Sequence, residues 1–226
     1  MFGPRIACAL VLLVASPAIA AQPEPAAAQP ATDTSEPAEE EQTPLIPAAK
    51  DQLSGHLLLG ASGLGLLPIA MLDGKTSFMD RAGLGVGAAG DLGIGVSRNV
   101  VFGIFGEYAR FTSSSDCSSC DTDTLAVGPF VRYHVVQGTR FDPWLMLGVG
   151  YRRLTASGGP KEADYRGIDW ARLALGGDWY ALSQVGFGPY AEVTLGTFTD
   201  RPSGTSATVY GMVNLGVRLA FDLQGR

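Results

Sequence analysis

Long stretches of this chain alternate between two kinds of side chain with a period of two. The pattern is clearest from residue 209 to 221. One set of alternate positions there holds Val209, Gly211, Val213, Leu215, Val217, Leu219 and Phe221, and the other holds Tyr210, Met212, Asn214, Gly216, Arg218 and Ala220. Successive side chains of a β-strand point to opposite faces, so this alternation predicts a strand with one aliphatic and one mixed polar face.

Seven further segments follow the same rule, which gives eight predicted strands. They span residues 53–63, 82–96, 100–112, 123–136, 142–155, 167–181 and 186–199. Several are long enough for tilted strands that cross a bilayer. The connections alternate between tight turns and longer polar or Gly-rich loops, as in outer-membrane barrels, whose short turns are periplasmic. An even number of strands would then place both ends of the barrel in the periplasm.

The region before the first strand predicts export. Arg5, an apolar run from Ile6 to Ala15 and a small-residue site before Ala21 indicate a signal peptide over 1–20. Residues 21–50 are rich in Pro, Ala and Glu and predict a disordered acidic linker, so the barrel domain should comprise 51–226. The linker holds six acidic residues against Lys50, and the whole chain carries −6. Such a chain has no basic face for nucleic acid.

Charged residues recur on the face opposite the aliphatic side chains. They are four acids and four arginines: Asp91, Glu107, Asp178, Glu192, Arg132, Arg152, Arg172 and Arg218. A buried charge is costly unless it is paired, and eight strands enclose a space that side chains just fill. The equal numbers predict a neutralised network inside a narrow barrel. The alternative is a soluble barrel with these charges solvated on its outside. Aromatic residues near the segment ends, including Phe102, Trp179, Tyr151 and Phe198, favour a membrane barrel with interfacial girdles.

The last strand carries a motif that resembles the signal read by barrel-assembly machinery on outer-membrane proteins: Asn214, Gly216, Leu219 and Phe221. With this motif, the region from about 53 to 222 resembles the OmpA-like and OmpX-like small barrels. The resemblance implies an all-β, eight-stranded, antiparallel up-and-down transmembrane β-barrel in the bacterial outer membrane. It implies as partners the assembly machinery, outer-membrane lipid and lipopolysaccharide. Five residues follow Phe221, and we expect no peptidoglycan-binding domain after the barrel.

Two smaller features concern the predicted outer loops. Cys117 and Cys120 are the two cysteines outside the signal peptide, and in an exported protein they predict a disulfide. The acidic residues around them disfavour a reactive thiol, and no further ligands for zinc are evident. Arg110, Arg153 and Arg166 lie near the loop rim and are candidates for contact with lipopolysaccharide. Neither a metal nor a cofactor is expected.

The chain offers little that predicts catalysis. His56 and His134 lie on the polar face, but neither is followed by the serine of the lipid A deacylase pattern, and Ser54 near His56 is a weak pair. We therefore expect no enzyme. The favoured function is structural, adhesive or surface-interacting, in a barrel with a filled interior. The alternative is a narrow porin-like channel for ions or small solutes, and a lipid-modifying barrel enzyme is the third hypothesis.

Overall fold

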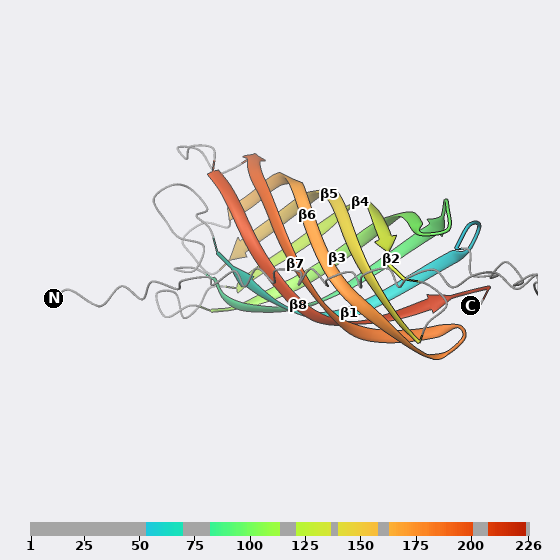
Figure 1. Cartoon of the computed structure of the whole chain (residues 1–226). Coiled ribbons are helices and arrows are strands. Elements are labelled where there is room, and N and C mark those ends of the chain that lie inside the picture. The colour runs from blue at the N-terminus through green and yellow to red at the C-terminus, as the bar shows by residue number, and fades with distance from the viewer. Residues whose placement is uncertain are drawn as a thin grey trace, which may run out of the picture. The chain divides into compact units, whose positions relative to one another are not determined.

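The computed structural model describes residues 53–69, 82–113, 121–136, 140–157, 163–200 and 208–224, and within them the chain forms eight β-strands (Figure 1). The strands are β1 (Leu57–Pro68), β2 (Ala82–Gly95), β3 (Val100–Ser113), β4 (Asp121–His134), β5 (Phe141–Ser157), β6 (Ala163–Leu182), β7 (Val185–Asp200) and β8 (Thr208–Asp222). The described part contains no helix that is long and apolar enough to cross a membrane.

Each strand pairs with the next in antiparallel fashion, and the sheet closes on itself. Closure is made by β1 and β8, whose register runs from Leu58 opposite Asp222 to Pro68 opposite Met212. A closed barrel leaves no strand edge free, so every strand finds hydrogen-bonding partners on both sides. The predicted eight-stranded, antiparallel, up-and-down barrel is confirmed.

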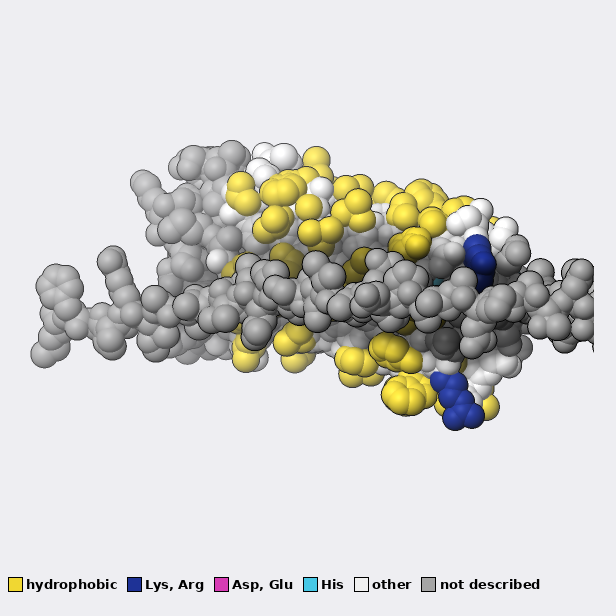
Figure 2. Space-filling model, viewed as in Figure 1, with side chains coloured by type: hydrophobic (Ala, Val, Ile, Leu, Met, Phe, Trp, Pro, Cys, Tyr) yellow, Lys and Arg dark blue, Asp and Glu magenta, His cyan; other side chains and the backbone are white. Residues whose placement is uncertain are grey.

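The two faces of the strands divide as the alternation requires. In β8, Asn214 and Arg218 are buried inside the barrel, whereas Leu215 and Val217 are exposed on its outer wall. Every strand contributes aliphatic side chains to that wall, for example Leu59, Leu84, Ile104, Leu125, Leu147, Leu175, Val193 and Leu215. Figure 2 shows hydrophobic side chains spread over the parts of the wall that are visible. An apolar exterior around a polar interior is the arrangement of a transmembrane barrel and the reverse of a soluble one.

Exposed aromatic residues lie toward both ends of the wall. Phe102, Trp179 and Phe187 are about half exposed near the tight turns, and Tyr151 is about half exposed toward the other rim. Amphipathic rings are favoured at the level of lipid headgroups. Phe198 is different, because it is fully buried inside the barrel. Its assignment to the girdle is therefore wrong. The even-numbered residues of β7 point into the barrel, and Phe198 is one of them.

The tight turns lie at the rim where β1 begins and β8 ends (Figure 1). At the turn between β2 and β3, the Ser97 N–H donates to the carbonyl of Val100 over 3.3 Å. Residues 183–184 alone connect β6 to β7, which makes this connection shorter still. We call this end the short-turn rim and the opposite end the loop rim.

The first strand differs most from its prediction, because it spans 57–68 and not 53–63. Residues 53–56 instead form a turn, in which the His56 N–H donates to the carbonyl of Leu53 over 2.9 Å. Gly55 permits this turn because its φ of 82° is in the left-handed region. The turn buries Leu53 inside the barrel at the short-turn rim. The residues that lead into β1 therefore fill part of that opening.

Two apolar clusters occupy the interior. The cluster at the loop rim stacks the Phe198 and Tyr210 rings with centroids 4.3 Å apart and packs Tyr165 against Phe198 at 5.5 Å. The second cluster includes Leu53, Val101, Phe130 and Trp144 and lies toward the short-turn rim. Charged residues lie between and beside these clusters, and they form the candidate site.

Candidate functional site: the charged interior

The middle of the barrel holds a cluster of three carboxylates and two arginines, which we call the central cluster: Glu107, Asp169, Glu192, Arg152 and Arg172. The Arg152 guanidinium is fully buried and lies 3.0 Å from Glu107 and 2.9 Å from Asp169. Its Nε and Nη2 both donate to the Asp169 carboxylate. Planar, two-pronged pairing of this kind is the strong geometry for arginine and carboxylate.

Arg172 connects Glu107 to Glu192, the third carboxylate of the central cluster. Its Nη2 lies 2.5 Å from Glu107 and 2.6 Å from Glu192, so one nitrogen serves two acids. The Asn214 amide donates to Glu192 over 2.8 Å, and the Tyr210 hydroxyl donates to Asp169. The central cluster therefore joins strands β3, β5, β6 and β7 across the interior, and Asn214 and Tyr210 connect it to β8.

A second group, the lower cluster, lies nearer the short-turn rim and contains two acids and two arginines: Asp91, Asp178, Arg132 and Arg218. The Asp91 carboxylate lies 3.0 Å from the Arg132 guanidinium and 2.9 Å from the Arg218 guanidinium. The Arg218 guanidinium also lies 2.6 Å from the Asp178 carboxylate. The Arg132 guanidinium carbon lies 4.7 Å from the centre of the Phe130 ring. Its positive charge is thus met by both a carboxylate and an aromatic face.

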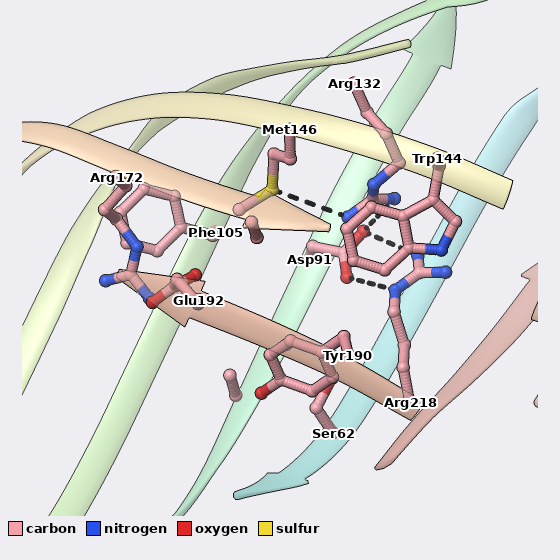
Figure 3. A pocket seen from close by; sticks show the side chains of 13 residues that line it. Ser62, Asp91, Phe105, Arg132, Trp144, Met146, Arg172, Tyr190, Glu192 and Arg218 are labelled. Atoms are coloured by element: carbon pink, nitrogen blue, oxygen red, sulfur yellow. Dashed lines mark hydrogen bonds and ion pairs between the residues drawn. The ribbon is translucent and has the colours of Figure 1, made fainter. Parts of the chain in front are cut away.

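A cavity of about 40 Å³ separates the two clusters. Figure 3 shows Arg172 and Glu192 on one side of it, Asp91 and Arg218 on the other, and Met146 and Tyr190 between them. A cavity of this volume holds only a few water molecules, since each needs roughly 10–15 Å³ by the same measure. Between the two clusters, the described side chains therefore leave room for little besides water.

Two histidine–aspartate pairs lie at the short-turn rim. His134 Nδ1 is 2.7 Å from Asp142, and His56 Nδ1 is 2.9 Å from Asp222. Both histidines thus face carboxylates. The described residues also contain no group of three or more His, Cys, Asp or Glu side chains placed to hold a metal ion.

Two glycines make room for these groups. A Cβ at Gly60 would collide with the Asp91 carboxylate and the Arg218 guanidinium, and a Cβ at Gly216 would collide with the Tyr190 ring and the Gly63 carbonyl. Gly216 therefore has a packing reason within the barrel, whatever its part in the predicted assembly motif. Leu219 of that motif lies on the outer wall.

All eight charged residues singled out from the sequence have side chains no more than 10% exposed, and they divide between the two clusters. Asp169 was missed, although it is fully buried and binds Arg152. The reason is a bulge in β6. Gly148 pairs with Arg172 but Gly150 pairs with Asp169, so three steps along β6 match two along β5. Residues 169 and 172 therefore both point inward despite opposite parity.

The three arginines predicted to contact lipopolysaccharide lie near the loop rim. Arg153 and Arg166 are exposed on the outer wall and share Asp164, while the Arg110 Nε donates to the Tyr108 hydroxyl over 2.8 Å. Cys117 and Cys120 lie outside the described residues, so their predicted disulfide stays a prediction, as does the signal peptide.

Comparison with known proteins gives fold resemblances alone. No family model matches the chain, and no curated protein matches it. Among solved structures, the chain is similar to Neisserial surface protein A at 14% identity and a TM-score of 0.47, over 72% of this chain and 96% of that one. OprG of Pseudomonas aeruginosa has 15% identity and a TM-score of 0.45, over 75% and 97%. The N-terminal barrel of Pseudomonas aeruginosa OprF has 14% identity and a TM-score of 0.43, over 74% and 100%.

Proposed function

We propose that this chain is an integral outer-membrane protein whose barrel is a rigid, filled anchor for the surface loops, with a structural, adhesive or other interaction role. One observation carries the proposal: the outer wall is apolar around all eight strands, whereas charges fill the interior. Water cannot solvate such a wall favourably, but the hydrocarbon core of a bilayer can. The predicted signal peptide over 1–20 and the acidic linker over 21–50 fit export through the periplasm.

The filled interior favours an anchor over a channel. Ion pairs bridge the barrel in two clusters, and the aromatic stack of Tyr165, Phe198 and Tyr210 occupies the loop rim. An ion crossing the barrel would have to displace both. Interaction would then be left to the outer surface and to the loops, which the predicted disulfide would constrain.

Membrane insertion can be tested directly on the full chain. After expression in a Gram-negative host, we expect the protein in the outer-membrane fraction, extractable only with detergent. We also expect unboiled and boiled samples to migrate differently on a denaturing gel, because a closed barrel resists detergent until it is heated. Recovery in a soluble periplasmic fraction without detergent would contradict the proposal.

A further inference from the structure

We propose that Arg153, Asp164 and Arg166 form a binding site for a phosphate group of an anionic lipid headgroup in the outer leaflet. We call these three residues the rim triad. The inference rests on the membrane location proposed above and adds to it a ligand and a place on the outer wall.

The two arginines of the rim triad are opposed across a strand pair. Arg153 of β5 and Arg166 of β6 are direct partners in the register. Like charges directly opposite each other destabilise a sheet, unless an anion lies between them. Their side chains are 50% and 48% exposed, so the guanidinium groups stand outside the barrel and are not part of its interior network.

Asp164 compensates this repulsion only in part. Its Oδ1 accepts from the Arg153 Nε over 2.9 Å, and its Oδ2 lies 3.1 Å from the Arg166 Nη2. One carboxylate thus holds both guanidinium groups side by side, and the triad keeps a net charge of +1. Asp200 lies opposite Arg166 in the register of β6 and β7 but forms no ion pair with it among the described residues.

Several guanidinium N–H groups of the triad remain available to a ligand. Arg153 uses only its Nε on Asp164, so both terminal nitrogens lack a hydrogen bond in the described part of the chain, and its acidic neighbour Asp123 forms no ion pair with it there. Guanidinium groups bind phosphate oxygens through paired N–H bonds, and Asp164 already holds two of these groups in a fixed arrangement. A tetrahedral phosphate offers enough oxygens to engage both.

The position of the triad selects a lipid over a soluble anion. Toward the middle of the barrel, the next outward residues are Tyr151 and Ile168, which are 47% and 52% exposed, followed by Trp170. The triad therefore lies where the apolar wall ends on the loop side, which is the depth of the outer-leaflet headgroups. A lipid bound there would place its phosphate on the arginines and its acyl chains on the apolar wall.

Arg110 is not included in this site. It lies on β3, separated from Arg153 by β4, and its Nε is already bonded to Tyr108. Its predicted contact with lipopolysaccharide is independent of the triad.

The test compares lipids that differ only in phosphate. The folded full chain in detergent micelles is titrated with diphosphoryl lipid A and with fully dephosphorylated lipid A, and bound lipid is counted by native mass spectrometry. We expect the diphosphoryl lipid to bind about tenfold more tightly or better, as charged hydrogen bonds to a phosphate would provide. The double variant Arg153→Gln/Arg166→Gln should lose this preference.

Two further variants separate charge, geometry and folding. Arg98→Gln removes an arginine at the short-turn rim and should leave the preference intact. Arg153→Lys/Arg166→Lys keeps the charge but loses the paired N–H geometry, so it should retain only part of the preference. Each variant must keep the heat-dependent gel shift of the wild type, which shows that the barrel is folded.

Several results would overturn the inference. Equal binding of both lipids by the wild type would do so, as would an unchanged preference in the double glutamine variant. Displacement of the lipid by millimolar inorganic phosphate would identify a site for free phosphate and not for a lipid. A chain that binds neither lipid but still inserts into the outer membrane would refute the site and leave the proposed location standing.

Discussion

At the scale of single residues, the sign of a buried charge decides how well its loss is tolerated. The central cluster has three carboxylates for two guanidinium groups, and all five side chains are almost fully buried. Removing a cation therefore leaves two uncompensated negative charges, whereas removing one acid leaves none. We expect Arg152→Met to cost about 3–5 kcal/mol of unfolding free energy, as is typical when a buried pair is broken.

The matched variant is Glu192→Gln, which keeps the shape of the side chain and brings the charge of the central cluster to zero. We expect it to change the free energy of unfolding by about 1 kcal/mol or less, because the amide can still accept from Asn214 and Arg172. Urea unfolding in lipid vesicles, followed by tryptophan fluorescence, gives both values. If Glu192→Gln proved as damaging as Arg152→Met, charge balance would not be what governs the central cluster.

The central cluster shows which interior residues can be predicted from their position in the alternating pattern of one strand. Parity placed Glu107, Arg152 and Glu192 on one face, because they lie on strands whose alternation is regular where they occur. Asp169 could not be predicted in this way. The bulge in β6 makes odd-numbered residues point inward up to 169 and even-numbered residues point inward from 172. A bulge depends on pairing with the neighbouring strand, and the alternation of one strand alone carries no record of it.

At the scale of elements, β1 shows that a strand can continue through a segment whose sequence predicts a loop. The second half of β1 reads Ser-Gly-Leu-Gly-Leu-Leu-Pro, which predicts a Gly-rich loop from residue 64 onward. In the structure this half pairs with β8 as far as Pro68 and with β2 as far as Leu66, and Leu64 lies opposite Gly87 of β2 and Gly216 of β8. Gly63 and Gly65 of this half are exposed on the outer wall, whereas Leu64 and Leu66 are buried in the interior opposite Gly87 and Gly85 of β2. This matching of leucines with glycines on the neighbouring strand is visible only once the strands are paired.

Two glycines of β1, one facing inward and one outward, test whether interior packing decides where a glycine is needed. Gly60 faces the interior, where a Cβ would meet the Asp91 carboxylate and Arg218, whereas a Cβ at Gly63 would have no atom within 4 Å. We expect Gly60→Ala to lower the free energy of unfolding by about 1–3 kcal/mol through overpacking. Gly63→Ala should be neutral or stabilise by up to about 1 kcal/mol, because alanine is favoured over glycine in a strand. Equal losses in both variants, measured by urea unfolding in vesicles, would assign the effect to the backbone of β1.

At the scale of the whole molecule, the strand number, the short-turn rim and the two unlike faces could all be predicted, because each depends on a repeat that runs through the entire chain. The direction in which the faces point was less secure, since a soluble barrel has the same alternation. Closure resolves it: aliphatic residues such as Leu175 and Leu215 are 60% and 63% exposed, while Arg152 and Glu107 are buried. What the loops recognise depends on residues outside this repeat.

The filled interior makes a prediction that belongs to the barrel as a whole. Current through it would have to pass the aromatic stack at the loop rim, both charged clusters and the Leu53 turn at the other mouth. Moving an ion past buried charges requires ion pairs to open at a cost of several kcal/mol each. We therefore expect no stable single-channel steps from the full chain in planar bilayers, under conditions where a known porin conducts. Reproducible steps that scale with salt concentration would mean that the clusters open within the bilayer, and the narrow channel would then replace the anchor as the function of this barrel.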